Sequence, residues 1–199
     1  ELLHSANDIL GELRRMSVTE FASAGVNHAL LETAYQSFIK SFDAKNGGFG
    51  GAPKFPPAMS LEFLLRYWKR TGDSGALEIV KNTAEKMAKG GIYDQLGGGF
   101  HRYAVDAIWL VPHFEKMLYD NAQLIRIYLH LYQIFSSSKF KVQSSKSVEA
   151  EFFRRIAVET LEYVKREMLD ASGGFYSSQD ADSEGEEGNS RGPVRFGIP

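Results

Sequence analysis

A short phrase ending in Gly-Gly-Phe recurs three times along this 199-residue chain, at residues 46–49, 97–100 and 172–175. The phenylalanines of successive copies are 51 and 75 residues apart (100 − 49 and 175 − 100). Paired glycines before an aromatic residue are typical of a tight turn that leads into a short extended piece. A near-regular spacing of this size, with helical segments between, indicates a repeat of helix pairs. Because one pair cannot bury its apolar face alone, neighbouring pairs must stack.

Apolar residues recur at helical spacing between these turns, so the sequence predicts an all-α fold. Ser60 and Ser74 are candidate N-caps, and Pro112 is placed where a first-turn proline is tolerated. If the helix pairs close into a ring, all three Gly-Gly-Phe turns lie on one rim. The predicted helices cover about residues 2–16 and 30–42, from Ser60, from Ser74 to Gly90, from Pro112 to Tyr132, and 148–168.

Bulk composition excludes several classes of function. The net charge of −2 gives no electrostatic reason to expect nucleic acid or an anionic membrane as a partner. No apolar run approaches the roughly 20 residues needed to span a bilayer. The absence of cysteine excludes disulfides, thiolate catalysis and cysteine-based zinc sites. This composition is compatible with a cytoplasmic protein, which is the location we expect.

The densest group of reactive side chains lies in residues 101–121. If a helix begins at Pro112, then His113, Lys116 and Asp120 share one stripe opposite an apolar one. Histidines and carboxylates that converge in this way are the usual groups for proton transfer. The alternative is an ordinary amphipathic helix, in which a solvated Lys116–Asp120 pair contributes less than about 1 kcal/mol.

Acidic residues gather in a second segment, where Asp180 and Asp182 are candidate ligand-binding carboxylates. The run suggests a calcium loop, but Arg191 stands where a bidentate glutamate is needed. The alternative is a solvated acidic loop. His101 and His113 are 12 residues apart and form no H-E-x-x-H motif, so we expect neither a metal nor another cofactor.

Four blocks of sequence together resemble the spermatogenesis-associated protein 20 family, whose bacterial members are known as thioredoxin domain-containing proteins of unknown function. The resemblance runs from about Glu1 to Gly188. The blocks are residues 48–56 (GFGGAPKFP), 98–103 (GGFHRY), Trp109 with 111–120 (VPHFEKMLYD), and 174–177 (GFYS) with 180–183 (DADS).

The resemblance implies a thioredoxin-like domain followed by an (α/α)6 toroid similar to N-acylglucosamine 2-epimerases and six-hairpin glycosidases. We expect residues 1–188 to form a partial toroid of about three helix-pair repeats. Residues 189–199 depart from the family pattern and are expected to be an atypical tail. The thioredoxin-like domain is absent from this chain, and it and the remaining hairpins are the expected partners in a full-length protein.

We therefore expect a small-molecule pocket, of carbohydrate type by analogy with that fold. Its chemistry would be proton transfer of an epimerase or glycosidase kind, and the alternative is a non-catalytic binding or interaction scaffold. The expected proton-transfer residues are His101, His113, Asp120, Asp180 and Asp182. The expected substrate-binding residues are Lys54, Phe55, Arg102, Tyr103, Asp106, Trp109, Glu115, Lys116 and Tyr119. Lys54 and Arg102 would hold anionic or hydroxyl groups, with Trp109 and Tyr119 as stacking walls.

Overall fold

The computed structural model describes residues 2–17, 28–137, 144–181, 185–186, 189–190 and 195–197. The chain divides into two compact units, Glu1–Ala34 and Tyr35–Pro199, a boundary that the sequence did not indicate. The first unit contains α1 (Leu2–Ser17), an amphipathic helix with basic residues in its last turn. Helix α2 (His28–Ser41) spans the boundary, and the second unit carries the elements that follow it.

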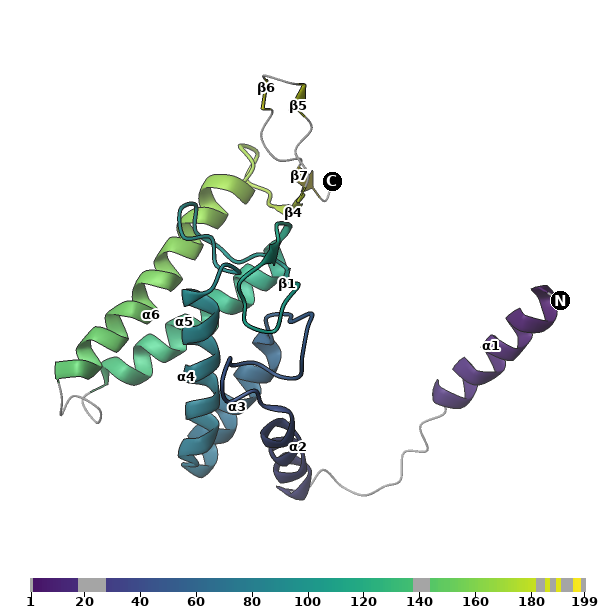
Figure 1. The fold of residues 1–199 in the computed structure, drawn as a ribbon, viewed down its shortest axis with the longest axis horizontal. Coiled ribbons are helices and arrows are strands. Elements are labelled where there is room, and N and C mark those ends of the chain that lie inside the picture. The colour runs from purple at the N-terminus through teal and green to yellow at the C-terminus, as the bar shows by residue number, and fades with distance from the viewer. Residues whose placement is uncertain are drawn as a thin grey trace. The chain divides into compact units, whose positions relative to one another are not determined.

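Helices alternate with the Gly-Gly-Phe turns along the second unit (Figure 1). Helices α3 and α5 each follow a turn, whereas α2, α4 and α6 each precede one. In the contacts between elements, α3 packs against both α4 and α5, and α5 packs against α6. The predicted all-α, paired-helix organisation is therefore confirmed. The helices are α2 (His28–Ser41), α3 (Ala58–Thr71), α4 (Ser74–Lys89), α5 (Leu118–Ser136) and α6 (Ser144–Tyr163), which a π-helical turn, Val164–Met168, extends.

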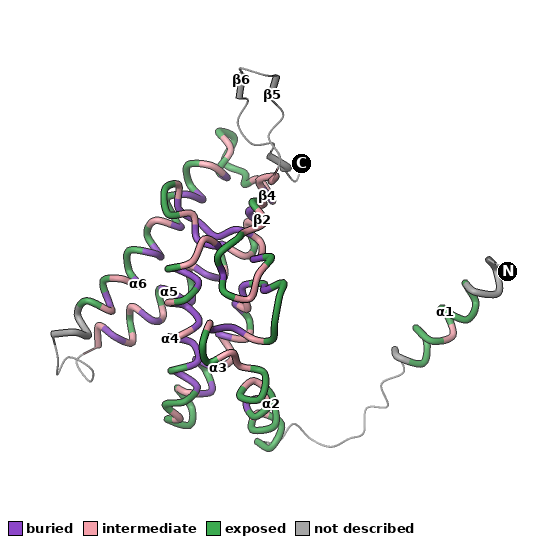
Figure 2. The backbone as a smooth tube through the Cα atoms, in the orientation of Figure 1, coloured by how far each residue is buried: buried purple, intermediate pink, exposed green. Residues whose placement is uncertain are grey.

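The core lies between these helices, and α4 buries one long face in it, where buried and exposed positions alternate along the helix (Figure 2). Small side chains on α4 let its neighbours approach closely, and the Tyr128 hydroxyl of α5 donates a hydrogen bond to the Ala84 carbonyl at 2.7 Å. The Tyr128 ring also stacks on Phe100, with ring centroids 5.4 Å apart. Truncating a buried aromatic ring of this kind to alanine typically costs about 3–5 kcal/mol.

Short strand pairings join the loops that lie between the helices. One ribbon pairs β1 (Tyr103–Ala104) with β2 (Pro112–His113). A second sheet has the order β3 (Lys116–Met117), β4 (Tyr176–Gln179) and β7 (Arg195–Gly197). A third pairs β5 (Gly185–Glu186) with β6 (Asn189–Ser190). Because Lys54 also forms an isolated bridge with Ala104, backbone pairing links the segments that follow the three turns.

Each Gly-Gly-Phe turn is closed by a bridge between the residues that flank it. The pairs are Phe42 with Phe49, Tyr93 with Phe100, and Leu169 with Phe175. In the second turn Gly99 has a φ of +80°, and a Cβ there would lie 2.4 Å from the Tyr163 ring. Only glycine fits both the backbone conformation and this close approach, which explains why the phrase contains paired glycines.

The helix expected from Pro112 begins six residues later, at Leu118, and that prediction was wrong. Pro112 and His113 form β2, and Lys116 forms β3, so the polar residues before the helix belong to strands. Helical spacing in the sequence cannot reveal a strand partner that is distant along the chain. Of the predicted polar stripe, Asp120 lies in the first turn of α5, while His113 and Lys116 precede the helix.

The predicted bounds of α1, α2 and α4 and the start of α3 lie within two residues of those in the structure. Helix α5 ends four residues after Tyr132, and α6 begins four residues before residue 148. Helix α3 begins two residues before Ser60, so Ser60 is not its cap. Helix α4 is capped by Asp73 rather than Ser74, because the Asp73 carboxylate accepts a 2.8 Å hydrogen bond from the Gly75 amide. Gly90 ends that helix as predicted.

Candidate functional site

Three aromatic rings form a ladder on the β1–β2 ribbon. Phe55 contacts Tyr103 with ring centroids 4.9 Å apart, and Tyr103 stacks on His113 at 4.7 Å with an interplanar angle of 13°. The strand register brings Tyr103 and His113 directly opposite each other. The Phe55 side chain is 55% exposed, so the end of the ladder is open to a ligand. The structure thus brings together three of the side chains that the sequence singled out.

An ionic network lies beside the ladder. Arg102 Nη1 donates a 2.8 Å hydrogen bond to Glu115 Oε2, and the pair is partly exposed. Arg102 also shares a hydrogen bond with Tyr119, and the Glu115 carboxylate raises the pKa of the guanidinium. The Tyr119 ring is 50% exposed. Arg102 is therefore held in place by two partners while part of its charge still faces solvent.

Asp120 completes this network from the first turn of α5. Burial raises the pKa of Asp120 to about 6; the positive charge of Arg102 opposes that shift and the negative charge of Glu115 adds to it. A carboxyl group with this pKa is partly protonated near neutral pH and can both donate and accept a proton. A perturbed carboxyl group among polar neighbours is typical of functional sites, although structural networks also produce one.

His113 is the second titratable group of the cluster. Its Nδ1 lies 4.0 Å from Glu115 Oε2, which is the distance limit for an ion pair and too long for a hydrogen bond. Among the described residues, this buried nitrogen has no hydrogen-bond partner. Since the ring is packed against Tyr103 yet its side chain is 38% exposed, His113 is held in place and still accessible.

The remaining proton-transfer candidates are placed differently. His101 is 6% exposed, and its Nδ1 lies 3.1 Å from the Phe114 carbonyl oxygen. Burial and the charge of Lys116 lower the pKa of His101, so it is a neutral core histidine rather than a group open to a ligand. Asp180 directly follows β4, and continuing the β3–β4 register by one residue places it opposite Glu115. Asp182 lies outside the described residues.

Lys54 and Lys116 were expected to contact a substrate, but the structure uses both inside the fold. Lys54 is 2% exposed and donates to Asp43 Oδ2 at 2.6 Å and to the Gly47 carbonyl at 2.9 Å. Lys116 is 5% exposed and makes the equivalent contacts in the next repeat. Its partners are Asp94 Oδ2 at 2.7 Å and the Gly98 carbonyl at 2.9 Å.

The same paired contacts explain two pKa shifts. The ammonium group of Lys54 holds the pKa of Asp43 well below its usual value. Burial alone would raise the pKa of Asp94, but hydrogen bonds from Lys116 and nearby amides lower that pKa to about 2. Each lysine is therefore a clasp on a Gly-Gly-Phe turn, and the expected ligand-binding role is wrong for both.

Trp109 and Asp106 likewise serve the loop that carries them. Trp109 is fully buried, with its indole Nε1 donating a 2.9 Å hydrogen bond to the Asn46 carbonyl, so neither ring face can stack on a ligand. The Asp106 carboxylate accepts hydrogen bonds from the amides of Ile108, Leu110 and Val111. Burial alone would raise the pKa of Asp106, but these amides hold that pKa below its usual value. The predicted stacking role of Trp109 is therefore wrong, whereas the binding role of Asp106 stays a prediction.

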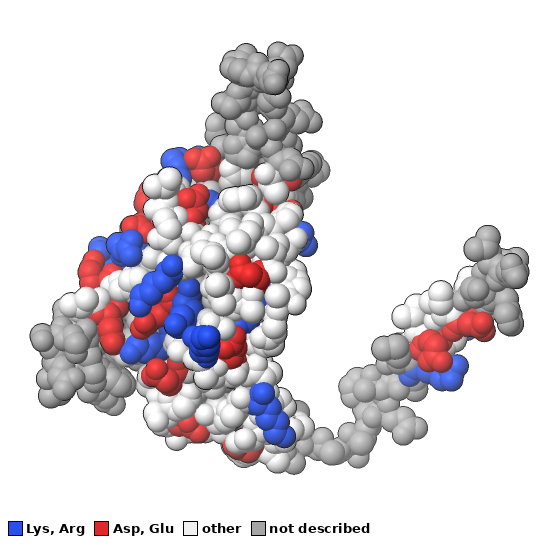
Figure 3. All heavy atoms as spheres, in the orientation of Figure 1, with Lys and Arg blue, Asp and Glu red and all other residues white. Residues whose placement is uncertain are grey.

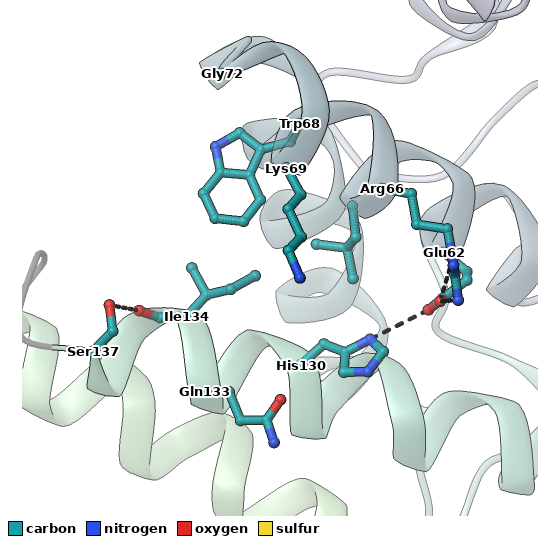
Figure 4. A pocket seen from close by; sticks show the side chains of 10 residues that line it. Glu62, Arg66, Trp68, Lys69, Gly72, His130, Gln133, Ile134 and Ser137 are labelled. Carbon is teal, nitrogen blue, oxygen red and sulfur yellow. Dashed lines mark hydrogen bonds and ion pairs between the residues drawn. The ribbon is translucent and has the colours of Figure 1, made fainter.

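Sequence reasoning missed a hollow of about 820 Å³ between α3 and α5 (Figure 4). Glu62 lies in its wall and contacts Arg66 at 2.8 Å, His130 at 3.3 Å and Arg126 at 3.5 Å. Two of these contacts tie α3 to α5, which gives the carboxylate a structural purpose. His130 comes from α5 and Glu62 from α3, so only the packing of the two helices places them side by side.

Charge is mixed over the helical part of the molecule. Figure 3 shows Lys and Arg side chains interspersed with Asp and Glu on the face that it displays. Within the described ranges, no group of three or more histidine, aspartate or glutamate side chains could hold a metal ion. In that same part of the chain, no helix is both long enough and apolar enough to cross a membrane.

Comparison with known proteins gives homologues for most of the chain. No protein-family model matches it. Spermatogenesis-associated protein 20 from Rattus norvegicus is 44% identical over 158 residues, and the Homo sapiens protein is 43% identical over the same length. These matches cover 77% of this chain and 18% of each relative. An uncharacterised protein from Caenorhabditis elegans is 36% identical over 170 residues, which cover 82% of this chain and 22% of that protein.

Solved structures with a similar fold are sugar epimerases. A sugar epimerase from a ruminal bacterium superposes with a TM-score of 0.58 at 18% identity, covering 76% of this chain and 40% of that one. Cellobiose 2-epimerase from Bacillus thermoamylovorans B4167 gives a TM-score of 0.58 at 12% identity, covering 77% and 40%. The chain therefore has the fold of part of an (α/α)6 toroid, as predicted.

Proposed function

We propose that this chain, which belongs to the spermatogenesis-associated protein 20 family, binds a carbohydrate at the Phe55–Tyr103–His113 ladder. The likeness of its fold to that of sugar epimerases supports this proposal. We further propose that His113 and Asp120 exchange protons with the bound sugar. The observation that carries the proposal is the ladder standing beside a carboxyl group whose pKa is about 6.

The aromatic rings of the ladder would bind the apolar face of a sugar ring. Pyranoses present C–H groups on one face, and a partly exposed aromatic ring offers contact area at low entropic cost. Phe55 is the most open member, while Tyr103 is held between Phe55 and His113. Arg102 and Glu115, already fixed by their mutual hydrogen bond, would orient the hydroxyl groups.

Proton transfer is assigned to the two groups with suitable chemistry. Asp120 is close to half protonated at pH 6, so it can take a proton from the substrate and return one. The His113 side chain is 38% exposed, stacks on Tyr103, and has its Nδ1 4.0 Å from Glu115 Oε2. A base next to an acid on one sugar is the arrangement that epimerisation requires, since a proton leaves a carbon centre and another arrives.

The test is a binding and turnover screen with monosaccharides, disaccharides and sugar phosphates. We expect thermal stabilisation by at least one sugar, and loss of that stabilisation in Phe55→Ala. Phe175→Ala is the matched control, because Phe175 is 45% exposed but lies outside the ladder. For a sugar that binds, NMR in deuterated water should show exchange of a carbon-bound proton, which Asp120→Asn abolishes.

Three results would contradict this assignment in whole or in part. If no sugar stabilises the protein, the scaffold alternative is favoured. If a sugar binds but Phe55→Ala and Phe175→Ala have equal effects, the ladder is not its site. Binding without proton exchange would leave a carbohydrate-binding module and would remove the roles given to Asp120 and His113.

A further inference from the structure

The aromatic ladder continues into an apolar surface on the same face of the β1–β2 ribbon. Successive residues of a strand alternate between its two faces. Tyr103 and Val105 therefore share one face, as do His113 and Val111 on the paired chain, while Ala104 points the other way and is fully buried. The Val105 amide donates to the Val111 carbonyl at 2.9 Å, which extends the pairing by another step.

This surface is exposed and made of large aliphatic side chains. Val105 is 49% exposed and Val111 is 50% exposed. At the tip of the ribbon Ile108 is 55% exposed and Leu110 is 60% exposed. Single exposed aliphatic residues are ordinary, but four within seven residues of one loop are a concentration that calls for a function, and we call these four side chains the aliphatic patch.

The loop that displays these side chains is fixed to the body of the protein. Trp109 anchors it in the core, where its carbonyl accepts a 3.1 Å hydrogen bond from the Ile92 amide. The Asp106 carboxylate binds the amides on either side of that anchor. An apolar surface that is already ordered loses little conformational entropy when a ligand covers it. The loop is thus built to hold exposed aliphatic groups in one place.

We propose that the site takes an amphiphilic glycoside, with the sugar on the aromatic ladder and an apolar aglycone on the aliphatic patch. This inference rests on the proposed function, since it extends the same site. An amphiphilic ligand fits this site because one ribbon carries aromatic rings at its base and exposed aliphatic side chains toward its tip. A free sugar would cover the first part and leave the second exposed.

The test compares ligands that differ only in the aglycone. The probes are methyl and hexyl β-glycosides of glucose, mannose, galactose and N-acetylglucosamine, used below micellar concentration, with 1-hexanol alone as the apolar reference. Each buried methylene favours binding, so the five added ones should make the hexyl glycoside bind at least about tenfold more tightly than the methyl glycoside. Isothermal titration calorimetry measures both affinities on the same protein.

The discriminating variant is Val105→Thr with Val111→Thr, which keeps the shape of both side chains and makes them polar. It should reduce the advantage of the hexyl glycoside at least threefold and leave the affinity for the methyl glycoside unchanged. Val148→Thr is the matched control, because Val148 is 71% exposed on α6, outside the ribbon. That variant should retain the full advantage.

The outcomes separate this inference from the function on which it rests. If methyl glycosides bind and hexyl glycosides bind no better, the aglycone site is overturned and the sugar site stands. If 1-hexanol binds as tightly as the hexyl glycoside, the patch is a general apolar docking surface, and the inference is also overturned. If none of the glycosides binds, both proposals are wrong.

Discussion

Replacing Asp120 by asparagine should make the protein more stable at neutral pH, because the carboxyl group is held where its charged form is disfavoured. Burial raises its pKa from 3.8 to about 6. Each pKa unit corresponds to 1.36 kcal/mol, so the shift represents about 3 kcal/mol in full. Because Asp120 is partly exposed, screening by solvent reduces the expected effect to about 1–2 kcal/mol.

The sign of this effect depends on pH in a defined way. A carboxyl group whose pKa is raised on folding contributes nothing unfavourable below its unfolded pKa, near 4. Its cost appears as pH rises and is complete above about pH 6. Asparagine cannot ionise, so the Asp120→Asn protein should match the wild type near pH 4. At pH 7.5 its free energy of unfolding should exceed that of the wild type by about 1–2 kcal/mol.

Urea unfolding followed by circular dichroism at several pH values between about 3 and 8 measures the free energy of unfolding. Asp106→Asn is a control of opposite sign, since amide hydrogen bonds lower the pKa of Asp106. That variant should lose stability at pH 7.5 and lose less as the pH falls below 4. A constant difference between Asp120→Asn and wild type across the range would refute the reasoning. If the proposed function is correct, the stabilised variant is also the inactive one.

Two further predictions concern the turns. Lys116→Met should lower the free energy of unfolding in urea by about 3 kcal/mol or more, because it leaves the Asp94 carboxylate without its buried partner. A decrease of less than about 1 kcal/mol would show that the Lys116–Asp94 pair contributes little. Gly99→Ala should lower the melting temperature far more than Gly173→Ala. Both glycines have positive φ, but only at Gly99 would a Cβ strike a ring, that of Tyr163; equal losses would mean that backbone strain alone sets the cost.

The repeat of helix pairs could be predicted from the sequence because its signals are local. Paired glycines mark the turns, and helical spacing marks the elements between them. Inward-facing residues of α6 such as Phe153 and Ile156 are fully buried, as that spacing indicates. The start of α5 could not be found in this way, since β2 and β3 exist only through partners that are 10 and 63 residues away (Tyr103 to His113, Lys116 to Gln179).

The candidate site was predicted in part, and the errors have a common cause. Residue type singled out Tyr103, His113 and Asp120, whose action on a ligand stays a prediction. It could not show that Lys54 and Trp109 stabilise the fold instead, because a lysine or tryptophan in a polar motif can either bind a ligand or hold a loop in place. Burial decides between the two, and burial is a property of packing rather than of the motif. A cytoplasmic location and the division at residue 188 stay predictions.

The way the Gly-Gly-Phe turns are closed makes each repeat depend on the one that follows it. Helix α4 covers the first turn through Thr83, whose hydroxyl accepts a hydrogen bond from the Gly48 amide, and α6 covers the second through Tyr163. No atom of the described residues lies within 4 Å of a Cβ built on Gly173 or Gly174. Local stability should therefore fall along the chain, with amide hydrogen exchange slow in the first two turns and fast in the third. In the first two repeats, the turn is therefore stabilised by the second of the two helices that follow it.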